Sequence, residues 1–185
     1  MNIKQLNLTR FAAIILVALA SIASVSSFAA LAQEAPRITH GGFYATDRVR
    51  RGGSVQAAVA LDVPRGFHVN ANKPLGKYSV PTVVSVTAPE GVRVSPVTYP
   101  RGLVRPFKFT DEKLAVYEGR PVMRFTMTVP ANFQGDRAVA RVRVKFQSCN
   151  DEVCFPPTTR DMEMPIEVVG AGEPVRPTNT GFFRK

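Results

Sequence analysis

Hydrophobic and polar residues alternate with a period of two along several stretches of this chain. The clearest run is 139–146, where valine and phenylalanine alternate with arginine and lysine, and the runs 54–61 and 122–129 come close to the same pattern. Such alternation is typical of antiparallel strands with one buried face and one face in water. Shorter β-rich runs occur at 67–70, 82–88, 92–99 and 162–169.

Turn-forming residues separate these runs, and the chain contains 15 prolines and 13 glycines. No segment has the apolar spacing of an amphipathic helix of useful length. The pattern predicts an all-β fold, an immunoglobulin-like two-sheet antiparallel β-sandwich. The absence of tryptophan and of a cysteine pair spanning the two sheets excludes an antibody-type domain. Turn signals occur at 64–66, 89–91, 100–102, 118–119 and 134–136.

The first 32 residues have a different character. Lys4 and Arg10 precede an apolar run, and small residues continue to Ala32. This order predicts a secretory signal peptide at 1–32 that is cleaved after Ala32. The alternative is an uncleaved membrane anchor, because the apolar stretch is almost long enough to span a bilayer. The remainder is predicted to form an N-terminal segment at 33–53, the sandwich domain at 54–170 and an exposed tail at 171–185.

The chain carries a formal net charge of +10. An exported basic protein could meet anionic lipid or acidic partners, but a solvated basic surface is the simpler interpretation. The arginines are scattered without interleaved aromatic residues, so no nucleic-acid partner is expected. The two histidines and two cysteines have no metal-site spacing, and we expect neither metal nor cofactor. His68 is interpreted as a hydrogen-bonded strand residue rather than a base or a ligand.

Both cysteines lie in FQSCNDEVCFPP, at 146–157. The strands predicted on either side form a hairpin, with Cys149 and Cys154 facing each other at a Cα distance that a disulfide accepts. A bond closing so short a loop would contribute about 2 kcal/mol as a staple. At an exposed hairpin tip it would also be accessible to an attacking thiolate. The sequence around the cysteines is equally consistent with a structural disulfide and with a dithiol that exchanges with partners.

The chain resembles a known family between Gly66 and Val169. The resemblance rests on GFHVNANKPLGKYSVPT, TAPEGV, LAVYEG and above all FQSCNDEVCFPPTTRDMEMPIEV, and the family is the periplasmic N-terminal domain of the thiol:disulfide interchange protein DsbD. It implies an immunoglobulin-like fold in which Cys154 is the attacking thiol and Cys149 the resolving one. It also implies a covering loop that shields the pair through Phe107 or Phe109.

The resemblance further implies partners. Such a domain accepts electrons from a thioredoxin-like protein linked to a membrane carrier, and it reduces disulfides of periplasmic clients, including those of cytochrome c biogenesis. We expect a free-standing version here, a disulfide reductase whose donor and client are separate proteins, with no stable membrane insertion after signal cleavage. Two alternatives stay open: a non-catalytic binding module with a static disulfide, and delivery of Cu(I) by the reduced cysteines with Met162 or Met164.

Overall fold

The computed structural model describes residues 34–183. The chain divides into Met1–Glu34 and a compact unit, Ala35–Lys185. The predicted signal peptide at 1–32 lies outside the described residues. Within 34–183, no helix is both long enough and apolar enough to cross a membrane. The fold is therefore described for the compact unit alone.

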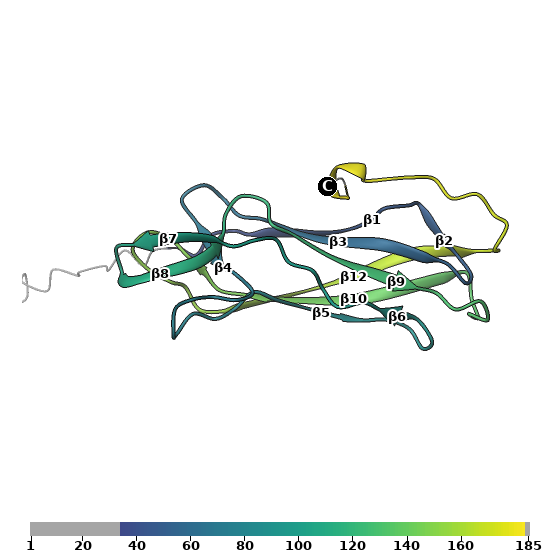
Figure 1. The fold of residues 1–185 in the computed structure, drawn as a ribbon, viewed down its shortest axis with the longest axis horizontal. Helices are drawn as coiled ribbons and strands as arrows, with labels where there is room; N and C mark the ends of the chain where they lie inside the picture. Colours follow the sequence, from purple (N-terminus) through teal and green to yellow (C-terminus); the bar gives the residue numbers. More distant parts are fainter. Residues whose placement is uncertain (1–33, 184–185) are drawn as a thin grey trace, which may run out of the picture. The chain divides into compact units, whose positions relative to one another are not determined.

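Two four-stranded sheets form the body of this unit (Figure 1). All their strand pairs are antiparallel except the pairing of β2 with β12. The predicted all-β, immunoglobulin-like sandwich is confirmed. The first sheet has the order β1 (Thr39–Tyr44), β3 (Ser54–Asp62), β9 (Val122–Thr128) and β6 (Arg93–Val94). The second has the order β2 (Arg48–Arg50), β12 (Thr158–Val169), β10 (Arg137–Phe146) and β5 (Val83–Thr87).

The core lies between the two sheets, as the period-two pattern requires. Along β10 every second residue is buried, including Val142 and Val144, while the arginines between them face outward. The buried side chains of β3 and β9 belong to the same hydrophobic cluster as those of β10 and β12. Each fully buried valine or leucine contributes about 1.5–3 kcal/mol. The hydroxyl of Tyr44 also links the sheets by donating to the carbonyl oxygen of Met164 over 2.8 Å.

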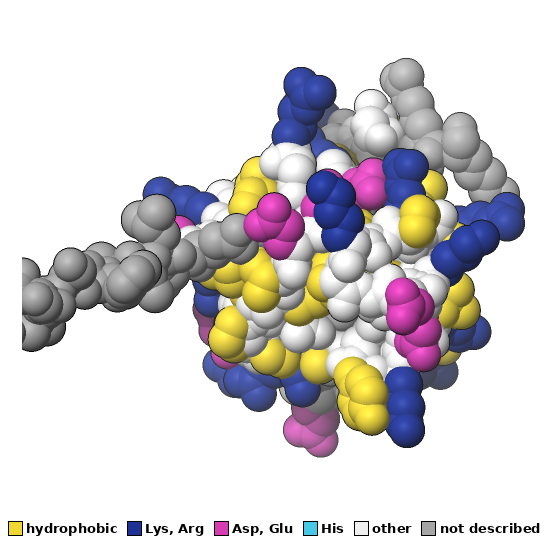
Figure 2. Space-filling view, turned by 90° about the vertical axis from the view of Figure 1, so that its left-hand side faces the viewer, with side chains coloured by type: hydrophobic (Ala, Val, Ile, Leu, Met, Phe, Trp, Pro, Cys, Tyr) yellow, Lys and Arg dark blue, Asp and Glu magenta, His cyan; other side chains and the backbone are white. Residues whose placement is uncertain are grey.

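A third sheet has the order β11 (Ser148–Cys149), β4 (His68–Asn70), β8 (Thr110–Tyr117) and β7 (Leu103–Phe107). Strands β4, β7 and β8 gather at one end of the sandwich (Figure 1). Seen from that end, apolar side chains are interspersed with basic and acidic ones (Figure 2). Leu103 and Val104 on β7 are 46% and 56% exposed. This small sheet contains Cys149 and brings it beside a strand from a distant part of the sequence.

The segment predicted at 33–53 contains strands β1 and β2, which alternation did not reveal. Gly42 in β1 explains part of the difference, because a Cβ there would lie 2.6 Å from two side-chain atoms of Met164. Glycine thus lets β1 approach the opposite sheet. The segment 171–183 is largely exposed, and it packs on β1 through Phe182, which stacks on Phe43 with 3.9 Å between ring centroids. Figure 1 shows it running back beside β1 to η1 (Thr180–Phe182).

Candidate functional site

The two cysteines form a disulfide at the end of the β10–β12 hairpin. The hairpin closes with Phe146 paired to Thr158, and Cys149 and Cys154 form an antiparallel bridge with their Cα atoms 4.0 Å apart. The predicted hairpin and the facing cysteines are therefore confirmed. The prediction of an exposed tip is wrong for Cys149, which is completely buried because β11 leaves the hairpin and pairs with β4. Cys154 is only half-buried.

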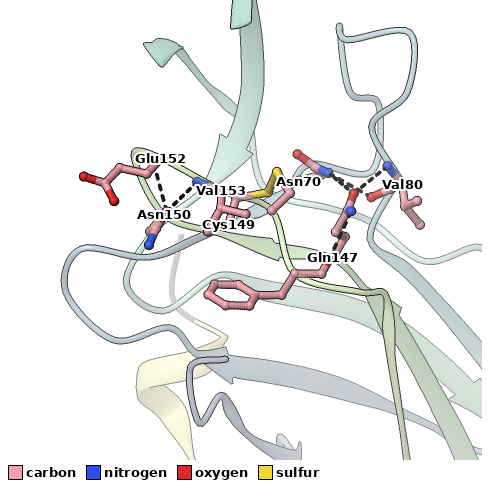
Figure 3. The surroundings of a disulfide bond; sticks show 9 residues. Asn70, Val80, Gln147, Cys149, Asn150, Glu152 and Val153 are labelled. Atoms are coloured by element: carbon pink, nitrogen blue, oxygen red, sulfur yellow. Dashed lines mark hydrogen bonds between the residues drawn. A yellow bond between two sulfur atoms is a disulfide. The ribbon is translucent and has the colours of Figure 1, made fainter. Parts of the chain in front are cut away.

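Asn150 organises the turn between the cysteines. Its side-chain oxygen accepts hydrogen bonds from the backbone N–H groups of Glu152 and Val153, at 2.9 and 2.7 Å (Figure 3). Its own N–H donates to the carbonyl oxygen of Val153 over 2.9 Å. An asparagine that satisfies the backbone ahead of it in this way is a common device for fixing a tight turn. The turn therefore holds the two cysteine backbones together independently of the sulfur–sulfur bond.

Gln147, two residues before Cys149, forms side-chain hydrogen bonds with neighbouring parts of the domain (Figure 3). Its side-chain oxygen accepts from Nδ2 of Asn70 at 3.1 Å and from the N–H of Val80 at 3.2 Å. Its amide nitrogen donates to the carbonyl oxygen of Phe155 over 3.2 Å. One half-buried side chain thus connects β4, the loop before β5 and the residue after Cys154. Sequence reasoning did not single out Asn70 or Gln147, although a glutamine continuing the alternation of β10 was a visible signal.

An aromatic column lies beside the buried cysteine. Cys149 pairs with His68 across the β11–β4 ladder, and the His68 ring stacks on Phe107 with 4.1 Å between centroids. Phe109, at the tip of the β7–β8 hairpin, stacks on Phe107 at 5.6 Å. The structure therefore brings Phe107 to the histidine that pairs with Cys149, with Phe109 one ring further out. A covering role for these phenylalanines stays a prediction.

A solvent-open depression of about 560 Å³ adjoins this column. His68 and Phe107 line it together with Asp151 from the cysteine turn and Glu118 from the turn after β8. Burial lowers the pKa of His68 below its ordinary value of 6.5, while the charges of Glu118 and Asp151 oppose that shift. Arg105 holds Glu118 in a two-bond pair at 3.1 and 3.2 Å. The imidazole is therefore neutral at neutral pH.

The described residues contain no cluster of three or more histidine, cysteine or acidic side chains that could hold a metal ion. Met164 is buried in the core, and Met162 pairs with Val142 well inside the hairpin. Neither methionine belongs to the turn that carries the cysteines. The geometry therefore gives the copper alternative no support from these two side chains.

Solved structures with similar folds include the reduced N-terminal domain of DsbD from Neisseria meningitidis, at 13% identity and a TM-score of 0.42, covering 68% of this chain and 86% of that one. The N-terminal periplasmic domain of ScsB from Proteus mirabilis matches at 13% identity and a TM-score of 0.47, covering 69% of this chain and 45% of that one. Likenesses this remote carry no argument about function. Comparison with curated protein sequences gives no match.

The sequence itself matches a protein family over most of the compact unit. Residues 43–165 match the family described as thiol:disulfide interchange protein DsbD, N-terminal. The matched range contains β10, the part of β12 up to residue 165, both cysteines and the aromatic column, so the disulfide lies inside the region that matches the family. The chain belongs to the DsbD N-terminal family and carries a thiol:disulfide interchange domain.

Proposed function

We propose that this domain passes electrons from a thioredoxin-like donor to disulfide-containing client proteins through Cys149 and Cys154, working in the periplasm after export. The observation that carries the proposal is the unequal burial of the pair: Cys154 is half-buried and Cys149 is completely buried. A cysteine pair that exchanges disulfides needs one sulfur that a partner protein can reach and a second, shielded sulfur that resolves the mixed disulfide. Membership of an interchange family supports the same conclusion.

The exposure difference also favours specific roles for the two sulfurs. Reduced Cys154 attacks the client disulfide as a thiolate and forms a mixed disulfide, and one client sulfur leaves as a thiolate. Cys149 then attacks Cys154, which restores the internal bond and releases the second client sulfur. The dithiol loses two electrons and the client disulfide gains them. The thioredoxin-like donor reverses these steps by attacking Cys154 of the oxidised domain.

Phe107 and Phe109 are proposed to cover the pair between encounters. Phe107 lies on the ring of His68 and belongs to β7, the outer strand of the small sheet, while Phe109 lies in the turn between β7 and β8. An outer strand pairs with one neighbour only, so a docking partner can displace it at lower cost than a central strand. The exposed apolar residues Leu103 and Val104 on the same hairpin would then contact that partner.

The equilibrium reduction potential of the Cys149–Cys154 pair tests this function. The purified protein is equilibrated in thiol redox buffers, and the reduced fraction is counted by thiol alkylation and mass spectrometry. We expect a potential within the range of known exchange proteins, roughly −180 to −270 mV. A potential well below about −300 mV would identify a structural bond and leave the binding module with a static disulfide as the better interpretation.

A further inference from the structure

The side chains of His68 and Cys149 lie on the same face of the β4–β11 ladder. Beyond the intervening rung of Val69 with Ser148, the side chains of Asn70 and Gln147 form a hydrogen bond with each other. Asn70 is two positions from His68, and Gln147 is two positions from Cys149, the residue that pairs with His68. Side chains two positions apart on a strand point to the same face. Directly opposed residues have Cβ atoms about 4.5–5.5 Å apart.

His68 is buried with a polar atom that finds no partner. Its side chain is 3% exposed, and its Nε2 atom makes no hydrogen bond within the described residues. Leaving such an atom unpaired costs about 1–3 kcal/mol. A disulfide sulfur has no proton to donate, so the oxidised pair cannot relieve this cost. A reduced Cys149 carries an S–H group, which is a donor that Nε2 can use.

The charges around His68 suit a neutral base. The groups that face it are Glu118, which is paired with Arg105, and Asp151 of the cysteine turn. Arg65 lines the same depression. Burial outweighs the two carboxylates and keeps the pKa of His68 below its ordinary value of 6.5. A neutral imidazole has a free lone pair for a proton, and the carboxylates stabilise the cation that forms.

We propose that His68 accepts the proton of the Cys149 thiol during resolution of the mixed disulfide, a role that rests on the function proposed above. In that intermediate Cys154 is bonded to a client sulfur and Cys149 is a thiol. Its proton passes to Nε2 of His68, and the thiolate attacks the sulfur of Cys154. The internal disulfide forms, the bond to the client breaks, and the departing client sulfur leaves with the bonding electrons and takes up the proton.

The buried state of Cys149 explains why such an acceptor is needed. An ordinary thiol has a pKa near 8.5, so only a few per cent is thiolate at neutral pH, and apolar burial lowers that fraction further. The depression that His68 lines is open to solvent, so the departing client sulfur can take up the proton there as it leaves the site. When the donor reduces the disulfide, the steps run in reverse: the neutral imidazole takes up the proton of the attacking donor thiol and passes it to Cys149 as that sulfur leaves Cys154.

A two-phase reaction with dithiobis(nitrobenzoate) isolates this step. Cys154 of the reduced protein attacks the reagent and releases one coloured thiolate, and Cys149 then displaces a second in a step independent of reagent concentration. We expect His68→Gln to slow the second phase about tenfold at neutral pH. The two proteins should converge as the pH rises to about 9.5, where hydroxide ionises the thiol without help. A deficit that is the same at every pH, or no deficit, would overturn the proposal.

Two further variants separate proton transfer from packing. His68→Phe keeps a ring to stack on Phe107 and leaves no unpaired polar atom, so it should fold well and yet resolve as slowly as His68→Gln. Normal resolution by His68→Phe would show that the ring only packs, and the proposal would be wrong. His40→Gln changes the other histidine of the chain, on β1, and should match the wild type. Because the reagent replaces the client, these rates can contradict the role of His68 even where the reduction potential supports the interchange function.

Discussion

The β10–β12 hairpin and the segment that connects its strands are neighbours in sequence but are stabilised in different ways. The hairpin pairs ten consecutive rungs without a register shift, from Arg137 with Glu167 to Phe146 with Thr158. Its inward side chains are apolar and its outward ones form ion pairs such as Arg143 with Asp161. Every part of this ladder is locally consistent, which is how regular strands obtain their stability.

The connecting segment, 147–157, is held by polar side chains and by a strand of another sheet. Gln147 and Asn150 supply its hydrogen bonds, and β11 pairs with β4. It also adjoins two buried polar atoms on β4 that find no hydrogen-bond partner among residues 34–183, Nε2 of His68 and Oδ1 of Asn70. The comparison indicates that the β10–β12 ladder stabilises the fold. The connecting segment is less stable than it could be, because it holds reactive groups in place beside unpaired buried polar atoms.

The largest effect is expected from substitution of the two cysteines, which lie in the connecting segment and not in the β10–β12 ladder. Cys154→Ser should abolish mixed-disulfide formation with a client, because the reachable nucleophile is gone. Cys149→Ser should instead accumulate the mixed disulfide, because nothing resolves it. Both are measured by mass spectrometry after non-reducing separation. Trapping by Cys154→Ser in place of Cys149→Ser would reverse the two roles.

The next largest effect is expected from removal of the two phenylalanines that are proposed to cover the disulfide. Replacing both Phe107 and Phe109 with alanine should increase the rate at which a small thiol reduces the disulfide several-fold, because the aromatic column no longer limits access. Phe109→Ala alone should do less, since only Phe107 lies on His68. Phe182→Ala, which removes a stack on Phe43 instead, is the matched control. An unchanged rate in the double variant would remove both phenylalanines from the site.

Sequence patterns predicted the ladder well and the segment poorly, for physical reasons. Alternation is a local signal, so the runs around Val142 and Ile166 identified β10 and β12. The pairing of β11 with β4 joins two very short strands from distant parts of the chain, and no local pattern specifies it. The family resemblance indicated the cysteines, but the unpartnered nitrogen of His68 depends on burial that only the assembled fold creates.

The β7–β8 hairpin escaped prediction for a different reason. Pro106 interrupts its first strand near a register shift, and the second begins with a charged stretch, so the period-two pattern is lost at its tip. Strand β1 likewise contains two glycines where alternating side chains would be expected. In both cases the neighbouring strands, rather than the local sequence, decide the structure.

A smaller effect, on stability rather than chemistry, is expected at Gln147. Gln147→Ala leaves Nδ2 of Asn70 with one fewer acceptor and the N–H of Val80 without its side-chain partner. We expect a loss of about 1–3 kcal/mol in the free energy of unfolding, measured with urea. Gln134→Ala is the control, because that glutamine is exposed and only donates to Asn132 within its own turn. Equal effects of the two changes would mean that the polar network does not hold the segment.

The smallest effect is expected on the outer face of the ladder. Arg143 donates two hydrogen bonds to Asp161, at 2.7 and 3.1 Å, and lowers the pKa of that carboxyl below its ordinary value of 3.8. The pair is exposed, so water and salt screen it, and Arg143→Ala should shift the urea midpoint far less than Gln147→Ala does.

The pH dependence of the free energy of unfolding identifies the small contribution of the Arg143–Asp161 ion pair. A carboxyl whose pKa is lowered by folding adds stability above its unfolded value of 3.8, and that stability is lost as the pH falls through the folded pKa. The difference between wild type and Arg143→Ala should therefore be present at neutral pH, shrink in high salt and vanish in strong acid. Arg143→Ala could instead lower the free energy of unfolding as much as Gln147→Ala does, by an amount independent of salt. That result would contradict the comparison, because one exposed ion pair would then stabilise the ladder as much as the buried polar network stabilises the connecting segment.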